Sequence, residues 1–269
     1  SYLINKNAEV RVLDPKGEYN GTAEGINDFG ELMVNIGLLL QQSYNDAWND
    51  YQRSLNGEIQ IWDYLVITAS NESQAESYRA QLDSRLQYLP KNTKYLVIPD
   101  AGGKRIGSGG STLSVIRAIA TDCGCIENIK GKRILVIHSG GDSKRVPQYS
   151  ALGKLFSPVP HELPDGRPST LFDEILVSVS AVPGRIPEGM LLLSGDAQLL
   201  FNPLLIDWDG KNAAAISFKE DVETGKEHGV FLAPCGSTVS RFLHKQPEET
   251  LRELGAVDEY NRVNIDTGA

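Results

Sequence analysis

The sequence is poor in cysteine, in cationic charge and in long apolar runs, and each shortage excludes a class of protein. Three cysteines in 269 residues are too few for a disulfide framework, and an odd count fits a reducing compartment. A net charge of −9 argues against a duplex-binding or anionic-membrane surface, because both require a basic face. No apolar run approaches the roughly 18 residues of a membrane-spanning helix. We therefore expect a cytoplasmic protein with no nucleic-acid and no membrane partner.

The few cysteines and histidines show no metal-ligand spacing. Cys123 and Cys125 form a Cys-x-Cys pair that is compatible with half of a metal site, but no further Cys or His follows at the required distance. A plain turn is the preferred interpretation. Of the four histidines, His138 and His228 border glycine turns, where we expect them to be structural or to shape a pocket.

The spacing of apolar residues predicts two kinds of structure along the chain, first a β-meander and then alternating strands and helices. Residues 8–34 alternate apolar and polar residues between turns, which predicts a short β-meander. From about residue 60, strands and helices alternate. Strands are expected at 62–68, 94–100, 133–138, 190–196 and 213–218, and helices from a capping box at Ser73–Glu76, from about Ser111 and over 171–182. Apolar stripes at Ala75, Tyr78, Leu82, Leu86 and Leu89, and at Leu113, Ile116 and Ile119, are expected to face inward.

This alternation predicts an α/β fold with a mainly parallel sheet, arranged as a three-layer αβα Rossmann-like domain. We expect a small β-rich segment over residues 1–40 and the Rossmann-like domain over 41–269. Near the end of the chain, a hairpin should flank the turn at 235–237, and Pro247 should start a short helix that Gly255 ends. The last residues, "NIDTGA", run from a strand into a glycine turn, so we expect a fragment that is truncated at its C-terminal end.

The stretch "LVIHSGGDSKRVP" (135–147) predicts an anion site at the end of a buried strand. Gly140 and Gly141 lack Cβ atoms, so a ligand can approach their backbone N–H groups closely. Lys144 and Arg145 place full positive charge beside these amides. A triphosphate suits such a site. The Walker pattern is absent, which argues against a P-loop NTPase.

A second glycine-rich loop, "GGKRIGSGGSTL" (102–113), also lies between an expected strand and an expected helix. It is too long for a dinucleotide-binding loop, and it resembles the phosphate loop of small-molecule kinases without the second half of that fold. A loop that only packs against its neighbour is the third interpretation. The candidate nucleotide-binding residues in this loop are Gly107, Gly109, Gly110 and Ser111.

Three further polar residues follow expected strands and could face the same edge of the sheet. Asp196 follows "LLLSG", where it either caps a turn or binds Mg²⁺ beside phosphates. Lys245 ends "SRFLHK", and Asp266 lies where "NIDTGA" leaves its strand. Ligands bind beyond the carboxyl ends of parallel strands, and the two phosphate-type loops share that edge, which favours the Mg²⁺ interpretation of Asp196.

The order of these motifs resembles a known signature. Gly140-Gly141, the Lys144/Arg145 pair and Pro147, followed by Lys154 and "PVP" at 158–160, are similar to the Gly-Gly-x-Gly-Thr-Arg-Leu-x-Pro and Lys-Pro motifs of sugar-1-phosphate nucleotidyltransferases. Asp142-Ser143-Lys144 departs from Gly-Thr, and "GKLFSPVP" from the usual lysine motif. These variants, with "PDAGGKRIGSGGSTL", resemble the L-fucose-1-phosphate guanylyltransferase part of bifunctional fucokinase/fucose-1-phosphate guanylyltransferases, from about residue 60 to 269.

The resemblance implies a nucleotidyltransferase type A-like fold and a reaction of GTP with L-fucose 1-phosphate that gives GDP-L-fucose and pyrophosphate. It implies catalytic roles for Lys144, Arg145 and Lys154, and Mg²⁺ held by Asp196. The glycines at 140 and 141 would contact the triphosphate, while Lys245, Asp266 and Gly268 would face the sugar phosphate. A C-terminal kinase domain is expected in the full-length protein. Two alternatives stay open: another NTP and hexose 1-phosphate, or a regulatory domain that binds a nucleotide sugar without turnover.

Overall fold

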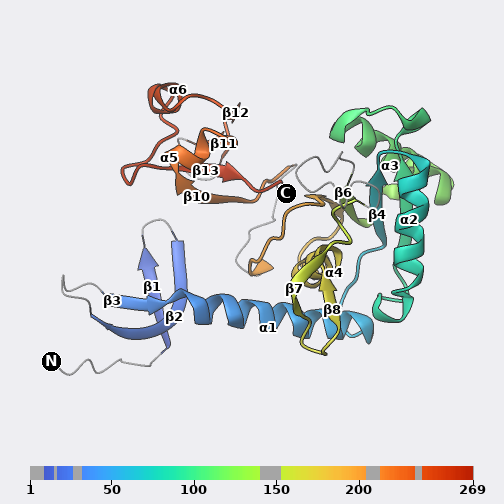
Figure 1. Ribbon diagram of the computed structural model, residues 1–269, viewed down its shortest axis with the longest axis horizontal. Coiled ribbons are helices and arrows are strands. Elements are labelled where there is room, and N and C mark those ends of the chain that lie inside the picture. The colour runs from blue at the N-terminus through green and yellow to red at the C-terminus, as the bar shows by residue number, and fades with distance from the viewer. Residues whose placement is uncertain are drawn as a thin grey trace.

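A four-stranded parallel sheet organises the centre of the chain (Figure 1). The computed structural model describes residues 9–14, 17–26, 32–139, 153–203, 213–233 and 238–268, with side chains from residue 41 onward. The strands lie in the order β5 (Lys94–Pro99), β4 (Tyr64–Ala69), β6 (Arg133–His138) and β9 (Gly189–Ser194). Every neighbouring pair is parallel, so all four carboxyl ends lie at one edge.

Both faces of this sheet are covered by apolar side chains, which explains why its central strands are continuous apolar runs. Successive residues of β4 point to opposite faces. Leu65 and Ile67 pack in a cluster with residues of α2 (Glu72–Asp83) and α4 (Leu171–Ser178). Tyr64 and Val66 pack in a second cluster with Val115 and Ile119 of α3 (Gly107–Asp122). The parallel α/β architecture expected from the sequence is confirmed for this part of the chain.

The helices next to the sheet differ in detail from the prediction. Helix α2 starts at Glu72, because the side chain of Asn71 caps it by accepting a hydrogen bond from the Gln74 N–H at 2.9 Å. The predicted capping box at Ser73–Glu76 is therefore wrong. The helix also ends at Asp83, which leaves Leu86 exposed in the short 3₁₀ turn η1 (Leu86–Tyr88) instead of buried.

Helix α3 presents a different face from the one expected. Its buried residues are Ser111, Val115 and Ile119, whereas Leu113 is 69% exposed. Leu113 lies two residues from both Ser111 and Val115, which is about 200° around a helix of 3.6 residues per turn. The prediction that Leu113 faces inward is wrong, because this residue belongs to the opposite side of the helix.

Helix α1 (Ile36–Leu55) and the hairpin of β7 (Pro158–Glu162) and β8 (Pro168–Thr170) were not predicted. Helix α1 runs along the bottom of the molecule in Figure 1 and buries Tyr51, whose hydroxyl donates to the Tyr88 carbonyl at 2.6 Å. The β7–β8 hairpin leads into α4. Helix α4 itself ends at Ser178 and is followed by the 3₁₀ turn η5 (Val182–Gly184), so it is shorter than expected.

Antiparallel sheets occupy both ends of the chain. Strands β1 (Glu9–Asp14), β2 (Gly17–Ile26) and β3 (Leu32–Asn35) form the predicted meander. The C-terminal sheet has the order β10 (Ser217–Asp221), β13 (Arg262–Asp266), β11 (Gly229–Leu232) and β12 (Arg241–His244). The expected hairpin is the β11–β12 pair, but β10 pairs antiparallel with β13 instead of joining the parallel sheet.

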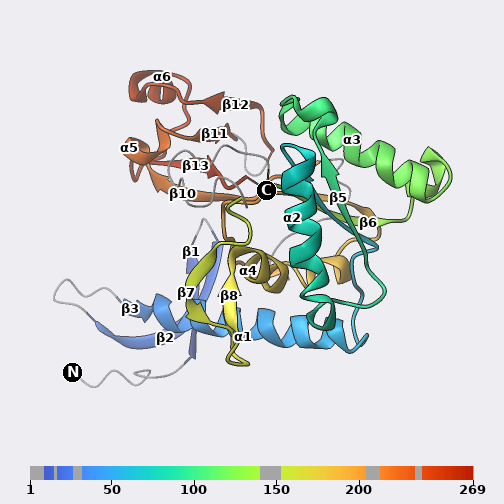
Figure 2. The same cartoon turned by 45° about the vertical axis from the view of Figure 1, so that its right-hand side comes forward.

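The C-terminal sheet has its own apolar cluster, built with α5 (Val222–Gly225) and α6 (Glu248–Glu253). Helix α6 follows Pro247, as predicted. Figure 2 shows this sheet beside the parallel sheet, with the C-terminus between the two. The segment after β13 thus returns to the carboxyl edge of the parallel sheet. In the described part of the chain, no helix is long and apolar enough to cross a membrane.

Candidate active site

The carboxyl ends of β6 and β9 meet at a turn that carries Asp196. The Gly195 N–H donates to the His138 carbonyl at 2.8 Å. A Cβ atom on residue 195 would lie 3.0 Å from that carbonyl oxygen and 3.0 Å from Ser139 Cβ, so the close approach favours glycine. This contact fixes Asp196 beside the point where β6 ends and the Gly140-Gly141 motif begins.

Lys154 and Asp196 form an ion pair at this edge. Lys154 Nζ lies 3.3 Å from Asp196 Oδ2, and the Ser194 hydroxyl donates to Asp196 Oδ1 at 2.6 Å. The Ser194 hydroxyl, with help from the Lys154 ammonium, holds the pKa of Asp196 below its ordinary value. Both side chains remain partly exposed, so a ligand in solvent can reach them. The structure thus brings together two of the predicted site residues from segments 42 positions apart.

The backbone around Lys154 is fixed on helix α2. Gly153 has a φ of +74°, and a Cβ atom there would lie only 1.8 Å from the Tyr78 hydroxyl oxygen. Tyr78 is fully buried, and its hydroxyl is 2.8 Å from Ser139 Oγ at the end of β6. On the other side, Leu155 is fully buried in the core. The two neighbours of Lys154 are therefore held while its ammonium group reaches Asp196.

The second glycine-rich loop begins helix α3 at the same edge. Gly107 is the first residue of the helix, with a φ of +72°, and Ile106 at its N-cap makes no side-chain capping bond in the described structure. A Cβ on Gly110 would lie 2.9 Å from Ile106 Cβ, whereas Gly109 has open space around it. The Ser111 hydroxyl donates to Asp100 Oδ1, just after β5, at 2.7 Å. Uncapped first-turn amides favour an anion.

His138 connects this helix to the sheet, a role that sequence reasoning left undecided between structural and pocket-shaping. The Thr112 hydroxyl donates to the Ser108 carbonyl at 2.9 Å, so its oxygen is left to accept from His138 Nε2 at 3.1 Å. Nδ1 then accepts from the Thr68 hydroxyl at 3.3 Å. Burial lowers the pKa of His138, which favours the neutral ring that this chain of bonds requires.

The predicted sugar-phosphate residues fall into two groups. The Gly268 carbonyl accepts from the Ser194 N–H at 2.9 Å, and the Gly268 N–H donates to Asp266 Oδ1 at 2.9 Å. Gly268 therefore lies directly against the turn that carries Asp196, and Asp266 accepts a hydrogen bond from Gly268. Lys245 follows β12 and is exposed, at the same end of the C-terminal sheet as Asp266 but with β11 between them.

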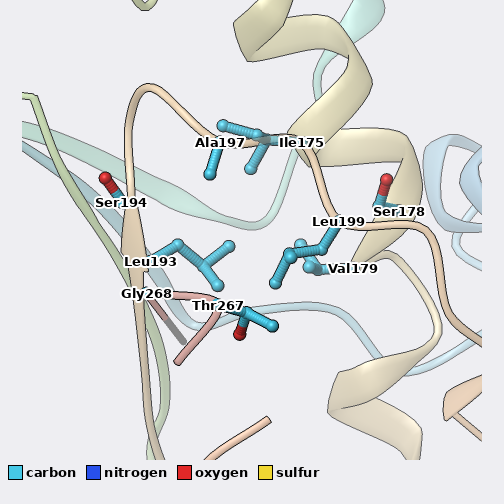
Figure 3. A pocket seen from close by; sticks show the side chains of 9 residues that line it. All are labelled: Ile175, Ser178, Val179, Leu193, Ser194, Ala197, Leu199, Thr267 and Gly268. Carbon is cyan, nitrogen blue, oxygen red and sulfur yellow. The ribbon is translucent and has the colours of Figure 1, made fainter. Parts of the chain in front are cut away.

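The close-up in Figure 3 shows what supports the Asp196 turn from below. A small pocket separates the turn from helix α4, and it has room for about one water molecule. Its lining residues are Ile175, Ser178, Val179, Leu193, Ser194, Ala197, Leu199, Thr267 and Gly268. This space is too small for a nucleotide.

The donor set at Asp196 fits Mg²⁺ only together with a phosphate ligand. Among the described residues, no group of three or more His, Cys, Asp or Glu side chains could hold a metal ion. Asp196 and Ser194 offer oxygen donors, and Mg²⁺ typically uses one or two carboxylates, with substrate phosphates and water completing six ligands.

Cys123 and Cys125 lie after α3, where the Cys123 thiol contacts the Cys125 carbonyl at 3.4 Å.

Four predicted residues lie outside the described part of the chain. Gly140, Gly141, Lys144 and Arg145 belong to the segment 140–152. Their roles stay predictions. The segment starts at the end of β6 and ends just before Gly153, so both of its ends are at the carboxyl edge of the sheet.

Comparison with known proteins identifies the family. Residues 126–269 match the fucose pyrophosphorylase domain, which is more than half of the chain. The chain belongs to the fucose pyrophosphorylase family. This confirms the resemblance found in its motifs.

Three curated relatives are similar to this fucose pyrophosphorylase domain. A fucose-1-phosphate guanylyltransferase of Mus musculus is 32% identical over 214 residues, covering 74% of this chain and 35% of the relative. The human protein of the same name is 32% identical over 219 residues, covering 74% and 34%. A bifunctional fucokinase/GDP-fucose pyrophosphorylase of Arabidopsis thaliana is 30% identical over 244 residues, covering 78% and 23%. The chain thus spans about a third or less of these relatives. No solved structure matches it.

Proposed function

We propose that this chain is a fucose-1-phosphate guanylyltransferase that makes GDP-L-fucose and pyrophosphate from GTP and L-fucose 1-phosphate. The observation that carries the proposal is the Lys154–Asp196 pair at the carboxyl edge of the parallel sheet, 3.3 Å apart. Two of the relatives bear this enzyme's name. A cation and a carboxylate at the edge where the sequence predicts phosphate-binding loops suit a reaction between two polyanions.

The chemistry requires charge neutralisation more than acid–base catalysis. An oxygen of the sugar phosphate attacks the α-phosphorus of GTP, the bond to the bridging α–β oxygen breaks, and pyrophosphate leaves with that electron pair. The second pKa of a phosphate monoester is about 6, so the nucleophile is largely ionised near neutral pH. No general base is needed. Positioning and electrostatic stabilisation then supply the rate.

Each part of the edge has a place in this reaction. Lys154 stabilises the negative charge that builds on the phosphates, and Asp196 supplies the carboxylate ligand for Mg²⁺. When bound, Mg²⁺ would neutralise part of the triphosphate charge. The first turn of α3 offers amides to a phosphate of the nucleotide. Gly268, which contacts Ser194 beside Asp196, and Asp266, which bonds Gly268, would contact the sugar phosphate, with Lys245 as a more distant cation.

The finer description of the fold belongs to the same proposal. Apolar clusters on both faces of the parallel sheet support a three-layer Rossmann-like domain of the nucleotidyltransferase type A class. The Arabidopsis relative is named as both a fucokinase and a pyrophosphorylase. A kinase domain C-terminal to this one is accordingly proposed for the full-length protein.

The test is pyrophosphate release across a matrix of the four NTPs and several hexose 1-phosphates, with and without Mg²⁺. The proposal predicts release that is fastest with GTP and L-fucose 1-phosphate and that depends on Mg²⁺. If release is faster with another NTP or another sugar phosphate, the proposed substrates are wrong but the proposed nucleotidyl transfer stands. Binding without release in any well would support a regulatory nucleotide-sugar domain instead.

A pair of variants tests the roles within that assay. Asp196→Ala and Arg145→Ala are each expected to lower turnover by about 100-fold or more, as removal of a group that stabilises transition-state charge does. Far-UV circular dichroism should show an unchanged fold. Near-wild-type rates in both variants would remove these residues from the reaction.

A further inference from the structure

Glu174 is a fully buried carboxylate in helix α4, with no place in the reaction described above. Its side chain is 0% exposed. Oε1 accepts hydrogen bonds from the Tyr44 hydroxyl at 3.3 Å and from the Ser169 hydroxyl, and it lies 3.4 Å from His161 Nε2. Oε2 accepts from Gln198 Nε2 at 3.2 Å. One carboxylate thus joins α1, β7, β8 and the segment after β9.

Burial of this carboxylate is energetically unfavourable. Transfer of a carboxylate out of water is unfavourable by several kcal/mol unless charges and hydrogen bonds compensate. Among the described residues, its partners are two hydroxyls, an amide and the imidazole of His161, which is about half exposed. Apolar residues of similar volume often replace such a group without loss of stability, so we ask what its hydrogen bonds do beyond packing.

The two carboxylate oxygens serve different parts of the molecule. Oε1 bonds Tyr44 and Ser169, which belong to the scaffold of α1 and β8. Oε2 bonds Gln198, which is two residues after Asp196. Two residues before Asp196, the Ser194 N–H is fixed by the Gly268 carbonyl. Asp196 therefore lies midway between two anchors, and Glu174 provides the second one.

The packing around the turn agrees with this division. In Figure 3, Ala197 and Leu199 lie over Ile175 and Val179, the first in the same helix as Glu174 and the second at that helix's C-cap. Apolar packing at Leu199 and the hydrogen bond from Gln198 to Glu174 therefore both hold the segment after Asp196 against the α4 region. Loss of the hydrogen bond would leave the apolar contacts but release the orientation of the backbone that carries Asp196.

We propose that Glu174 is a positioning residue for Asp196, acting through the amide of Gln198. The inference rests on the proposed function to the extent that Asp196 faces Mg²⁺ and nucleotide. Removal of a residue that orients a metal ligand typically weakens metal binding by about 10- to 100-fold. The expected effect of breaking the Glu174–Gln198 bond is therefore on metal–nucleotide affinity, in addition to any effect on stability.

The structure offers a matched pair of variants that break opposite ends of the cluster. Gln198→Ala removes the bond at Oε2, toward Asp196, and Tyr44→Phe removes a bond at Oε1, toward helix α1. Mn²⁺ binding in the presence of the non-reactive analogue guanosine 5′-(α,β-methylene)triphosphate, followed by electron paramagnetic resonance, needs no turnover. Thermal unfolding reports the structural cost of each change.

We expect Gln198→Ala to weaken Mn²⁺–analogue binding at least 10-fold and Tyr44→Phe to change it less than 2-fold, with similar decreases in melting temperature. The exchange variant Glu174→Gln/Gln198→Glu reverses donor and acceptor, and it should recover affinity that each single change loses. Equal effects of Gln198→Ala and Tyr44→Phe on metal binding, or no recovery on exchange, would overturn the inference.

Failure of the proposed function has a different signature. A wild-type protein that binds Mn²⁺ and the analogue but forms no GDP-L-fucose would refute the activity, while the comparison of variants would still decide the role of Glu174. Absence of any metal–analogue binding to the wild-type protein would overturn both.

Discussion

Replacement of Gly153 by alanine tests how Lys154 is held at the site. The new Cβ would lie 1.8 Å from the Tyr78 hydroxyl oxygen, 2.8 Å from Tyr78 Cζ and 3.1 Å from Gln74 Nε2. Tyr78 belongs to helix α2, is fully buried and contacts Ser139 with its hydroxyl, so it cannot move away without disturbing the core. The residue also has a φ of +74°, which a side chain disfavours.

The magnitude follows from these two causes. A non-glycine residue in the left-handed region costs about 1 kcal/mol, and an added methyl in a packed core costs about 1–3 kcal/mol. We expect Gly153→Ala to lower the free energy of unfolding by about 3 kcal/mol, which corresponds to a melting temperature lower by roughly 9 °C. Turnover should also fall, because the neighbouring Lys154 shifts away from Asp196.

Gly57→Ala is the matched control, measured in the same urea titrations. Gly57 has a similar φ of +72°, but its Cβ would meet nothing within 4 Å, so only the backbone cost of about 1 kcal/mol should appear. In a Tyr78→Phe background the cost of Gly153→Ala should fall by about 1 kcal/mol or more, because the nearest clash is gone. If Gly153→Ala lowers the free energy of unfolding no more than Gly57→Ala does, the packing of Gly153 against Tyr78 does not hold Lys154 in place, and the prediction is refuted.

Two further predictions concern stability. Burial lowers the pKa of His138. At pH values just below 6.5, the unfolded chain therefore binds a proton at this residue that the folded chain does not bind. The free energy of unfolding should thus rise with pH in that range. Urea titrations at about pH 5.5 and 7.5 should show this dependence in the wild type and less of it in His138→Gln. Ile119→Ala should lower the free energy of unfolding by about 2–4 kcal/mol, and Leu113→Ala by less than about 0.5 kcal/mol, because only Ile119 is buried. Equal losses would contradict the observed orientation of α3.

The parallel sheet was predictable from the sequence because its strands are apolar runs and the central ones, β4 and β6, are buried on both faces. "YLVIT", "RILVIH" and "MLLLS" are continuous apolar runs, and the observed strands agree with the predicted ones within about two residues. The rule that ligands bind beyond the carboxyl ends of such strands placed Asp196 at this edge, and the family resemblance added Lys154. Their contact at 3.3 Å agrees with that expectation.

Helix α1 and the face of α3 were missed for a local reason. Ala47, Tyr51 and Leu55 recur every four residues along α1, but polar residues between them conceal the stripe. In α3 the serine at 111 occupies a buried position, where it bonds Asp100, so a pattern built on apolar residues alone selected the wrong side.

The Glu174 cluster could not have been predicted from local patterns. Tyr44 and Glu174 are 130 positions apart, and nothing in helix α4 distinguishes this glutamate from a solvated one. The same holds for the contact between Gly153 and Tyr78, which requires the three-dimensional fold. Sequence spacing identifies residues that carry charge, whereas the residues that orient them become visible only in the structure.

The most direct test of the central claim is a double-mutant cycle on Lys154 and Asp196, with kcat/KM measured for pyrophosphate release from GTP and L-fucose 1-phosphate. If the two residues act on the same phosphates at one edge of the sheet, Lys154→Ala and Asp196→Ala will each lower kcat/KM strongly, and the double variant will be about as slow as the slower single variant. Fully additive losses, or a normal rate in either single variant, would contradict a shared site.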